Sequence, residues 1–120
     1  MDYTATIKYI RTSPRKLRLV ADAVRALPIE RALGALLHVP QAAARPLADA
    51  ISSAVANAKA KQADVSGLTF KTLEIGGGPV MKRYREVSRG QAHGYKKRMS
   101  HIRVVLTDEH KSETVTKRVT

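Results

Sequence analysis

The stretch "GGGPVMKRYREVSRGQAHGYKKRMSHIRVVL", residues Gly76–Leu106, has too few large apolar residues to be buried in a core, and this constrains the architecture of the chain. Residues 82–103 carry eight Lys and Arg against one acid, Glu86, so seven of the chain's twelve net positive charges fall in 22 residues. Few large aliphatic side chains lie here, yet strand-like runs flank it at 68–75 and 101–107. The pattern predicts an antiparallel ribbon whose outer part covers no core.

The length of this ribbon predicts that it leaves the globule. Its turn is expected within "SRGQAHG", where Ser88, Arg89, Gly90 and Gly94 tolerate turn conformations. Each leg would have about 20 residues, or roughly 65 Å at 3.3 Å per residue. The other 80 or so residues form a globule with a radius of gyration of only about 12 Å. The ribbon therefore projects into solvent or a partner. A basic loop that orders only on its partner is the alternative.

The rest of the chain predicts one strand and three helices. "YTATIKYI" at 3–10 alternates as a strand, and Ser13 and Pro14 suit the start of a helix that ends at Leu27. Further helices are expected at 29–37 and 41–62, and an irregularity between Phe70 and Leu73 indicates a bulge. The expected apolar faces of the helices are Leu17, Val20, Ala21, Val24; Ile29, Leu33, Leu36, Leu37; and Leu47, Ile51, Val55, Ala58.

These elements predict an α+β fold, in which a small antiparallel three-stranded sheet packs against three helices and carries a long protruding basic β-hairpin. Residues 1–110 form a single domain that includes the hairpin at about 76–103. Residues 108–120 have mixed charge and no periodicity, and they are expected to be a flexible tail.

The composition argues against an enzyme, a metal site and a membrane protein. The chain has no cysteine, so a disulfide or a thiolate zinc site is impossible. No apolar run approaches the length of a membrane span. The four histidines are scattered, and "GGGPVMKR" lacks the spacing of a phosphate-binding loop. We expect no catalytic residue, no metal and no cofactor.

The charge instead favours a nucleic-acid partner. A net charge of +12 and a pI near 10.5, concentrated in one segment, are typical of a chain that neutralises phosphates. Tyr84, Tyr95, His93 and His101 offer flat faces on which bases can stack. An architectural DNA-binding protein with a basic β-arm remains the alternative. Such proteins are normally dimers with an apolar wedge at the arm tip, for which Val87 is the one candidate.

Three separated motifs resemble the large-subunit ribosomal protein twenty-two family over residues 3–106. They are "SPRKLRLVAD" at 13–22, "SAVANA" at 53–58, and "GPVMKR" at 78–83 with "KKRMSHIRVV" at 96–105. The resemblance implies a structural constituent of the large ribosomal subunit that binds its rRNA and supports subunit assembly. It also implies a hairpin that lines the nascent-peptide exit tunnel. The expected location is the cytoplasm, within the ribosome, with an organelle ribosome as a variant.

The resemblance and the charge pattern together assign the expected contacts. We expect rRNA contacts from Arg11, Ser13, Arg15, Lys16, Arg18, Asn57, Lys82, Arg83, Arg85, Arg89, Tyr95, Lys96, Lys97, Arg98, Ser100, His101 and Arg103. The expected tunnel-facing tip is Val87, Ser88, Arg89, Gly90, Gln91, Ala92 and His93. The implied partners are large-subunit rRNA, neighbouring large-subunit proteins and the nascent polypeptide, with no membrane and no homo-oligomer.

The tip departs from the family pattern. Glu86, Val87 and Gln91 stand where the family usually has a proline or an arginine, and Gly94 stands where it typically has an aliphatic residue.

Overall fold

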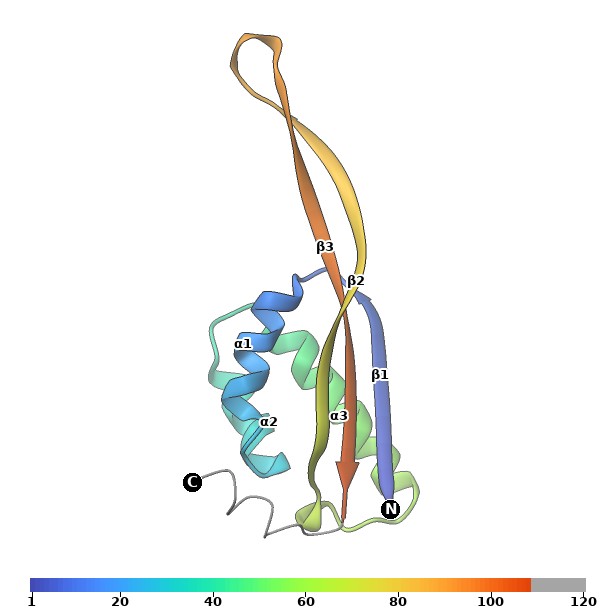
Figure 1. Cartoon of the computed structure of the whole chain (residues 1–120). Helices are drawn as coiled ribbons and strands as arrows, with labels where there is room; N and C mark the ends of the chain where they lie inside the picture. The colour runs from blue at the N-terminus through green and yellow to red at the C-terminus, as the bar shows by residue number, and fades with distance from the viewer. Residues whose placement is uncertain (109–120) are drawn as a thin grey trace, which may run out of the picture.

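The computed structural model describes residues 1–108, in which three helices lie against a sheet whose outer hairpin extends beyond them (Figure 1). The elements are β1 (Asp2–Ile10), α1 (Pro14–Val24), α2 (Ile29–His38), α3 (Ala44–Ala60), the 3₁₀ turn η1 (Val65–Gly67), β2 (Thr69–Glu86), the 3₁₀ turn η2 (Ser88–Gly90) and β3 (Ala92–Thr107). The predicted α+β fold is confirmed. Apart from Asp108, the predicted flexible tail lies outside the described residues.

The sheet is antiparallel, in the order β1-β3-β2, so the last strand of the described chain is its centre. The side chains on its inner face come from every second residue of each strand, as the pleat of a β-sheet requires. Ile102 of β3 lies between Ile7 and Ile75, and Val104 lies between Ala5 and Leu73. Thr4, Thr6, Glu74 and Arg103 on the other face are exposed. Val105 and Thr107 of the central strand are buried on that same face, which is otherwise more polar, so the helices pack on the apolar side.

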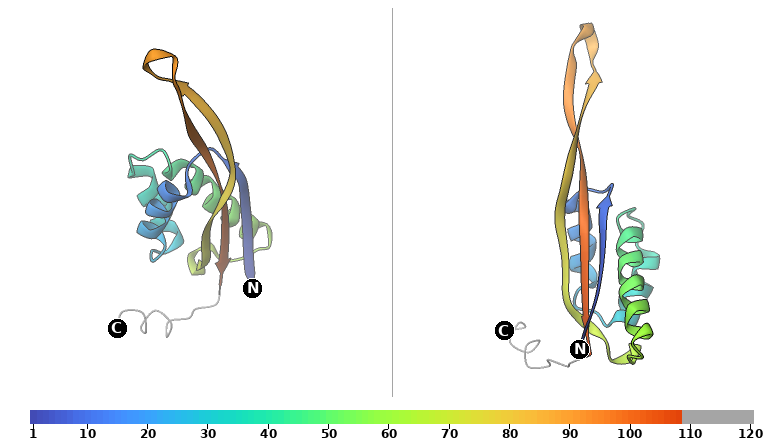
Figure 2. Two further views of the ribbon diagram at one scale, coloured as in Figure 1. Left: turned by 45° about the horizontal axis from the view of Figure 1, so that its top comes forward. Right: turned by 90° about the vertical axis from the view of Figure 1, so that its right-hand side faces the viewer.

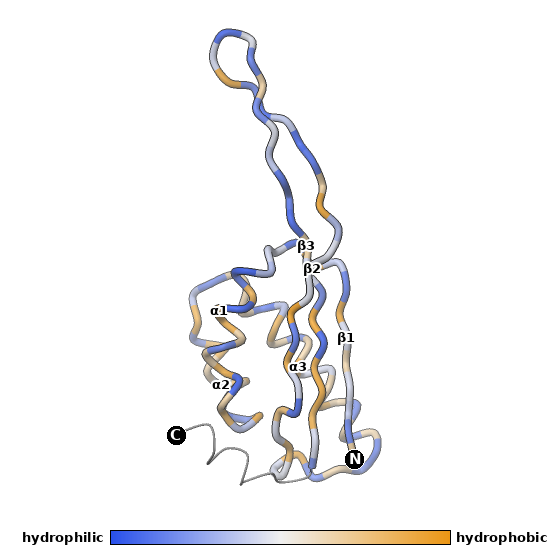
Figure 3. The backbone as a smooth tube through the Cα atoms, viewed as in Figure 1, coloured by the Kyte–Doolittle hydropathy of each residue, from blue (hydrophilic) through white to orange (hydrophobic). Residues whose placement is uncertain are grey.

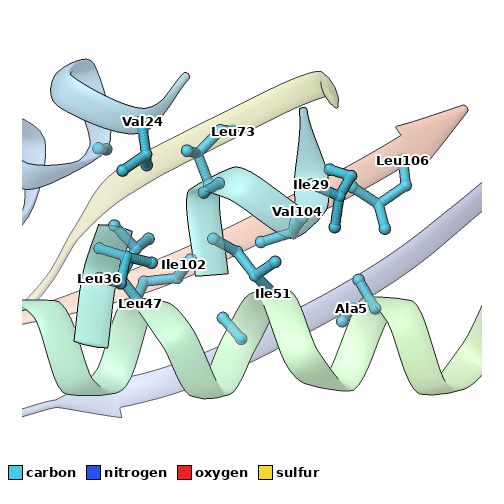
Figure 4. Close-up of a cluster of buried hydrophobic side chains, with 14 of the residues drawn as sticks. Ala5, Val24, Ile29, Leu36, Leu47, Ile51, Leu73, Ile102, Val104 and Leu106 are labelled. Carbon is cyan, nitrogen blue, oxygen red and sulfur yellow. The ribbon is translucent and has the colours of Figure 1, made fainter. Parts of the chain in front are cut away.

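The helices bury most of the predicted apolar faces, although Leu33 is only half-buried and Leu37 is exposed. The predicted stripes of α1 and α3 are buried, and Figure 4 shows Leu47 and Ile51 of α3 directed at Ile102 and Val104 of the sheet. Leu37 was expected in the core but is 82% exposed. The α2 helix turns Ile29, Ala32 and Leu36 inward, and Leu37 lies about 100° further round the helix.

Helix ends follow the sequence signals only in part. Ser13 occupies the N-cap position of α1 and Pro14 its first turn, as predicted, but the Ser13 side chain makes no capping hydrogen bond. The α1 helix ends at Val24, before Leu27, and α3 begins at Ala44, which places Pro46 in its first turn. There the proline ring displaces no helical hydrogen bond.

The outer hairpin, residues 80–98 and hereafter the arm, projects from the globule (Figure 2). Beyond Ser100, where β1 ends, β2 and β3 continue as a two-stranded ribbon with pairs from Val80↔Arg98 to Glu86↔Ala92. Every residue from 82 to 98 is exposed. The estimate of 65 Å per leg is too long, because the inner half of each leg belongs to the three-stranded sheet. The whole described structure is 61 Å long.

Register shifts interrupt the strands at three places. The predicted irregularity is confirmed between Phe70 and Thr72. A second shift, between Gly77 and Val80, marks the point where the arm leaves the globule. The third lies in β1 between Ile7 and Ile10, where Tyr9 has a left-handed φ of 62°. Bulges bend and twist a ribbon, so the second shift helps to set the arm's direction.

Asp64 makes a pH-dependent contribution to stability at the start of β2. Its carboxylate accepts hydrogen bonds from the Ser66 hydroxyl (2.7 Å) and the Ser66 N–H (3.1 Å), which hold the pKa of Asp64 below its ordinary value of 3.8. A carboxyl pKa lowered by folding stabilises the fold above pH 3.8, and the contribution is lost as the pH falls through the folded pKa.

We expect Asp64→Asn, which keeps an acceptor but cannot titrate, to show a shallower loss of stability in acid than the parent chain. Asp64→Ala should lose stability at neutral pH as well, because the turn loses its cap. Urea unfolding midpoints at neutral pH and at about pH 3 measure both effects. Identical acid profiles for the parent and Asp64→Asn would contradict the assignment.

Candidate nucleic-acid interface

The arm presents seven cations to solvent. They are Lys82, Arg83, Arg85, Arg89, Lys96, Lys97 and Arg98. None of them forms an ion pair with an acid among residues 1–108. Figure 3 shows the arm as mostly hydrophilic, in contrast to the mixed colouring of the strands below it. The arm is therefore a basic surface that no acid within residues 1–108 neutralises by an ion pair.

The strand register sets like charges against each other. Lys82 lies directly opposite Lys96. Like charges at paired positions destabilise a ribbon, and a two-stranded ribbon is marginal in water without that penalty. An external polyanion bound along both legs would turn this repulsion into attraction.

Two tyrosines add flat apolar surface to the arm. Tyr84 is 78% exposed and lies opposite Gly94, so a base can reach its ring. Tyr95 is 37% exposed, and the Arg85 guanidinium carbon lies 5.3 Å from its ring centroid. That distance is within the range of a cation–π contact.

The tip is a compact turn. The Val87 N–H donates to the Gln91 carbonyl at 2.8 Å, and Arg89 and Gly90 have left-handed φ values of 64° and 70°. This places the turn where the sequence predicts it, except that Gly94 lies within β3 and not in the turn. All the predicted tip residues, Val87–His93, are exposed.

Further predicted contacts lie where the arm meets the globule. Arg11, Ser13 and Lys16 line one cleft together with Lys96, Lys97 and Arg98 of β3. Arg15 is exposed on α1 but does not line this cleft. The basic residues at the start of α1 and on the β3 leg of the arm thus form one surface, although about 80 residues separate them in the sequence.

Ser100 is not available to RNA. Its side chain is fully buried and its hydroxyl donates to the Thr12 carbonyl at 2.5 Å. His101 is half-buried, its Nδ1 accepts a hydrogen bond from the Tyr9 N–H at 3.1 Å, and its ring meets the Tyr9 ring edge to face. His101 thus fixes the end of β1 to the central strand, and Ser100 fixes the segment that follows β1.

Three more predicted contact residues hold the sheet in place. The Arg18 guanidinium donates to the Ile75 carbonyl at 3.0 Å, and the Asn57 amide donates to the Thr4 carbonyl at 2.9 Å. Arg103 lies 3.8 Å from Glu74 on the outer face. These side chains are exposed, so part of each remains open to a partner, but each already has a structural partner.

Sequence reasoning missed Arg25. Its guanidinium donates to the Leu73 carbonyl at 2.8 Å and pairs with Asp22 at 2.6 Å. Arg25 and Arg18 lie two helical turns apart on α1, and both bond to carbonyls of the edge strand β2. The spacing was visible in the sequence, but the strand edge that it faces was not. Capping these carbonyls protects an edge that could otherwise pair with another chain.

The described residues offer no other obvious site. No helix between residues 1 and 108 is long and apolar enough to cross a membrane. Within the same range, no three His, Cys, Asp or Glu side chains gather as metal ligands would.

Comparison with known proteins agrees with the motifs. The family model described as ribosomal protein L22p/L17e matches residues 5–107. Large ribosomal subunit protein uL22 of Desulfotalea psychrophila is 47% identical over 109 residues, which cover 90% of this chain and 99% of the relative. The uL22 of Desulfatibacillum aliphaticivorans is 45% identical over 106 residues, 88% and 98% of the two chains. That of Chloroflexus aggregans is 42% identical over 110 residues, 91% and 97%.

A match over most of the chain, with relatives of nearly the same length, confirms the resemblance seen in the three motifs. It also gives the protein a structural role in the large ribosomal subunit and no role as an enzyme. The chain belongs to the ribosomal protein L22p/L17e family.

Proposed function

We propose that the chain binds large-subunit rRNA through the arm and the basic surface at its base, and thereby supports assembly of the subunit in a cytoplasmic ribosome. One observation carries this: seven cations lie on a fully exposed ribbon without an acid partner among residues 1–108. Neighbouring large-subunit proteins are the further partners. Ser100 is left out of the contact set because it is buried, and His101, Arg18, Asn57 and Arg103 act chiefly within the fold.

The arm tip, Val87–His93, is the part that we propose to face the nascent polypeptide in the exit tunnel. Its position at the far end of the ribbon and its full exposure support this role. The tip carries one cation, Arg89, and the cation-rich legs behind it would lie in rRNA. Family membership favours this reading over an architectural DNA-binding protein.

Hydrogen exchange tests the proposed binding. In the free protein, amides 82–98 should exchange much faster than those of α3 and of β3 near Val104, because the arm has no core behind its hydrogen bonds. In isolated large subunits that contain the protein, the arm amides should be protected. Cosedimentation with large subunits at moderate salt is the accompanying control for binding. Fast arm exchange in a protein that does cosediment would exclude the arm as the contact.

A further inference from the structure

An open cleft of about 920 Å³ lies at the base of the arm. One wall is the segment from Arg11 into α1, the second is the connection between α2 and α3, and the third is the start of the arm. Each wall contributes one large apolar side chain that the cleft exposes, namely Leu19, Val39 and Met81. Its volume lies in the range of about 300–1,000 Å³ that is typical of sites for small organic groups.

The charge on this cleft has one sign. Arg11 and Lys16 on one side and Lys96, Lys97 and Arg98 on the other give five cations, and no acid is among the lining residues. Each of the five side chains is exposed. Such a rim selects a polyanion and disfavours an acid-free peptide or a second copy of this basic chain.

Between the cations the cleft is apolar. Leu19 keeps 70% of its surface exposed although it sits in the middle of α1, and the half-buried Val39 and Met81 approach from the other two walls. Phosphates and riboses along a regular duplex leave such a surface uncovered. The face of an unstacked base is flat and apolar and can cover it.

Polar side chains that line the cleft can form hydrogen bonds with the edge of such a base. The Ser13 hydroxyl makes no bond to its own helix, and the exposed Gln41 amide lies on the opposite wall. Hydroxyl and amide side chains are the types that hydrogen-bond to base edges in RNA complexes.

We propose that this cleft binds one unpaired nucleotide of the RNA, with the base against Leu19, Val39 and Met81 and the flanking phosphates on the five cations. The inference rests on the proposed rRNA binding and adds the kind of RNA element that the base of the arm selects. The cations of the arm contact the RNA backbone, whereas the cleft requires a nucleotide that has left its helix.

The test uses the full chain and two RNA hairpins that differ only in one bulged 2-aminopurine in the stem. At about 0.1 M salt, the bulged RNA should bind between about 5 and 100 times more tightly than the paired one, and its fluorescence should change on binding. Leu19→Ser should reduce this preference about threefold or more. Leu37→Ser is the matched control, because Leu37 is also an exposed helical leucine but lies outside the cleft.

The outcomes separate this inference from the proposed function. Equal, salt-dependent binding of both RNAs would overturn the nucleotide site and leave the RNA-binding function in place. Failure to bind either RNA would count against both. The affinity for an acidic Glu–Leu peptide is the third measurement. If Leu19→Ser lowers this affinity but changes the affinity for neither RNA, the cleft binds a protein segment and the inference is overturned.

Discussion

Changing Lys96, Lys97 and Arg98 together to alanine should weaken rRNA-fragment binding by about 100-fold or more at 0.1 M salt. The three residues lie at consecutive positions of β3, are fully exposed and have no acid partner among residues 1–108. Each phosphate contact contributes about −0.7 to −0.9 to the slope of log K against log salt. A parent slope of about −4 to −5, from roughly six contacts, should therefore become shallower by about 2 to 3.

The free triple variant should unfold at the parent temperature or slightly above it. The three side chains cover no apolar surface of the core, and their removal relieves the repulsion between Lys82 and Lys96. Lys8→Ala/Arg31→Ala/Lys59→Ala is the matched control, since it removes the same charge from exposed positions outside the arm. If this control loses as much affinity and slope as the arm variant, net charge and not the arm determines binding.

The layout of the fold could be predicted because its local signals agree with one another. Alternation at Ile102, Val104 and Leu106, the stripes of α1 and α3 and the position of the turn all follow from side-chain period and turn chemistry. Leu37 shows the limit of this reasoning. A cluster of leucines in a short helix leaves open which of them faces inward, and packing against α3 decides it.

The site was less predictable because its residue types have two uses. Ser100 lies in a basic strand and looks like a phosphate ligand, but its register opposite Gly77 and near the end of β1 buries it against Thr12. Arg18 looks like a surface cation and caps a strand edge. The apolar floor of the cleft comes from Leu19, Val39 and Met81, which only the tertiary fold brings together.

Gly78→Ala should lower the free energy of unfolding by about 1–3 kcal/mol, because the atoms around the added methyl group must move to relieve the crowding. A Cβ at Gly78 would lie 3.1 Å from the Met99 carbonyl carbon and 3.2 Å from both the Met99 oxygen and His101 Cε1. Two of these atoms are backbone of the central strand, and the hydrogen bond from Tyr9 to the His101 ring opposes movement of the third. The strain falls at the register shift between Gly77 and Val80, which helps to orient the arm.

Gly77→Ala is the matched control for this substitution, because a Cβ at Gly77 meets nothing within 4 Å. Gly77→Ala should leave the free energy of unfolding unchanged or raise it by up to about 1 kcal/mol, because alanine lowers the entropy of the unfolded chain. Urea unfolding of the two free variants measures the difference directly. If the close approach of Gly78 to β3 sets the arm's direction, Gly78→Ala should also weaken RNA binding and Gly77→Ala should not. Only the Gly78 substitution displaces β3 beside Lys97 and Arg98. Equal stability of the two variants would show that β3 yields at Met99, and the close approach at Gly78 would then have no part in orienting the arm.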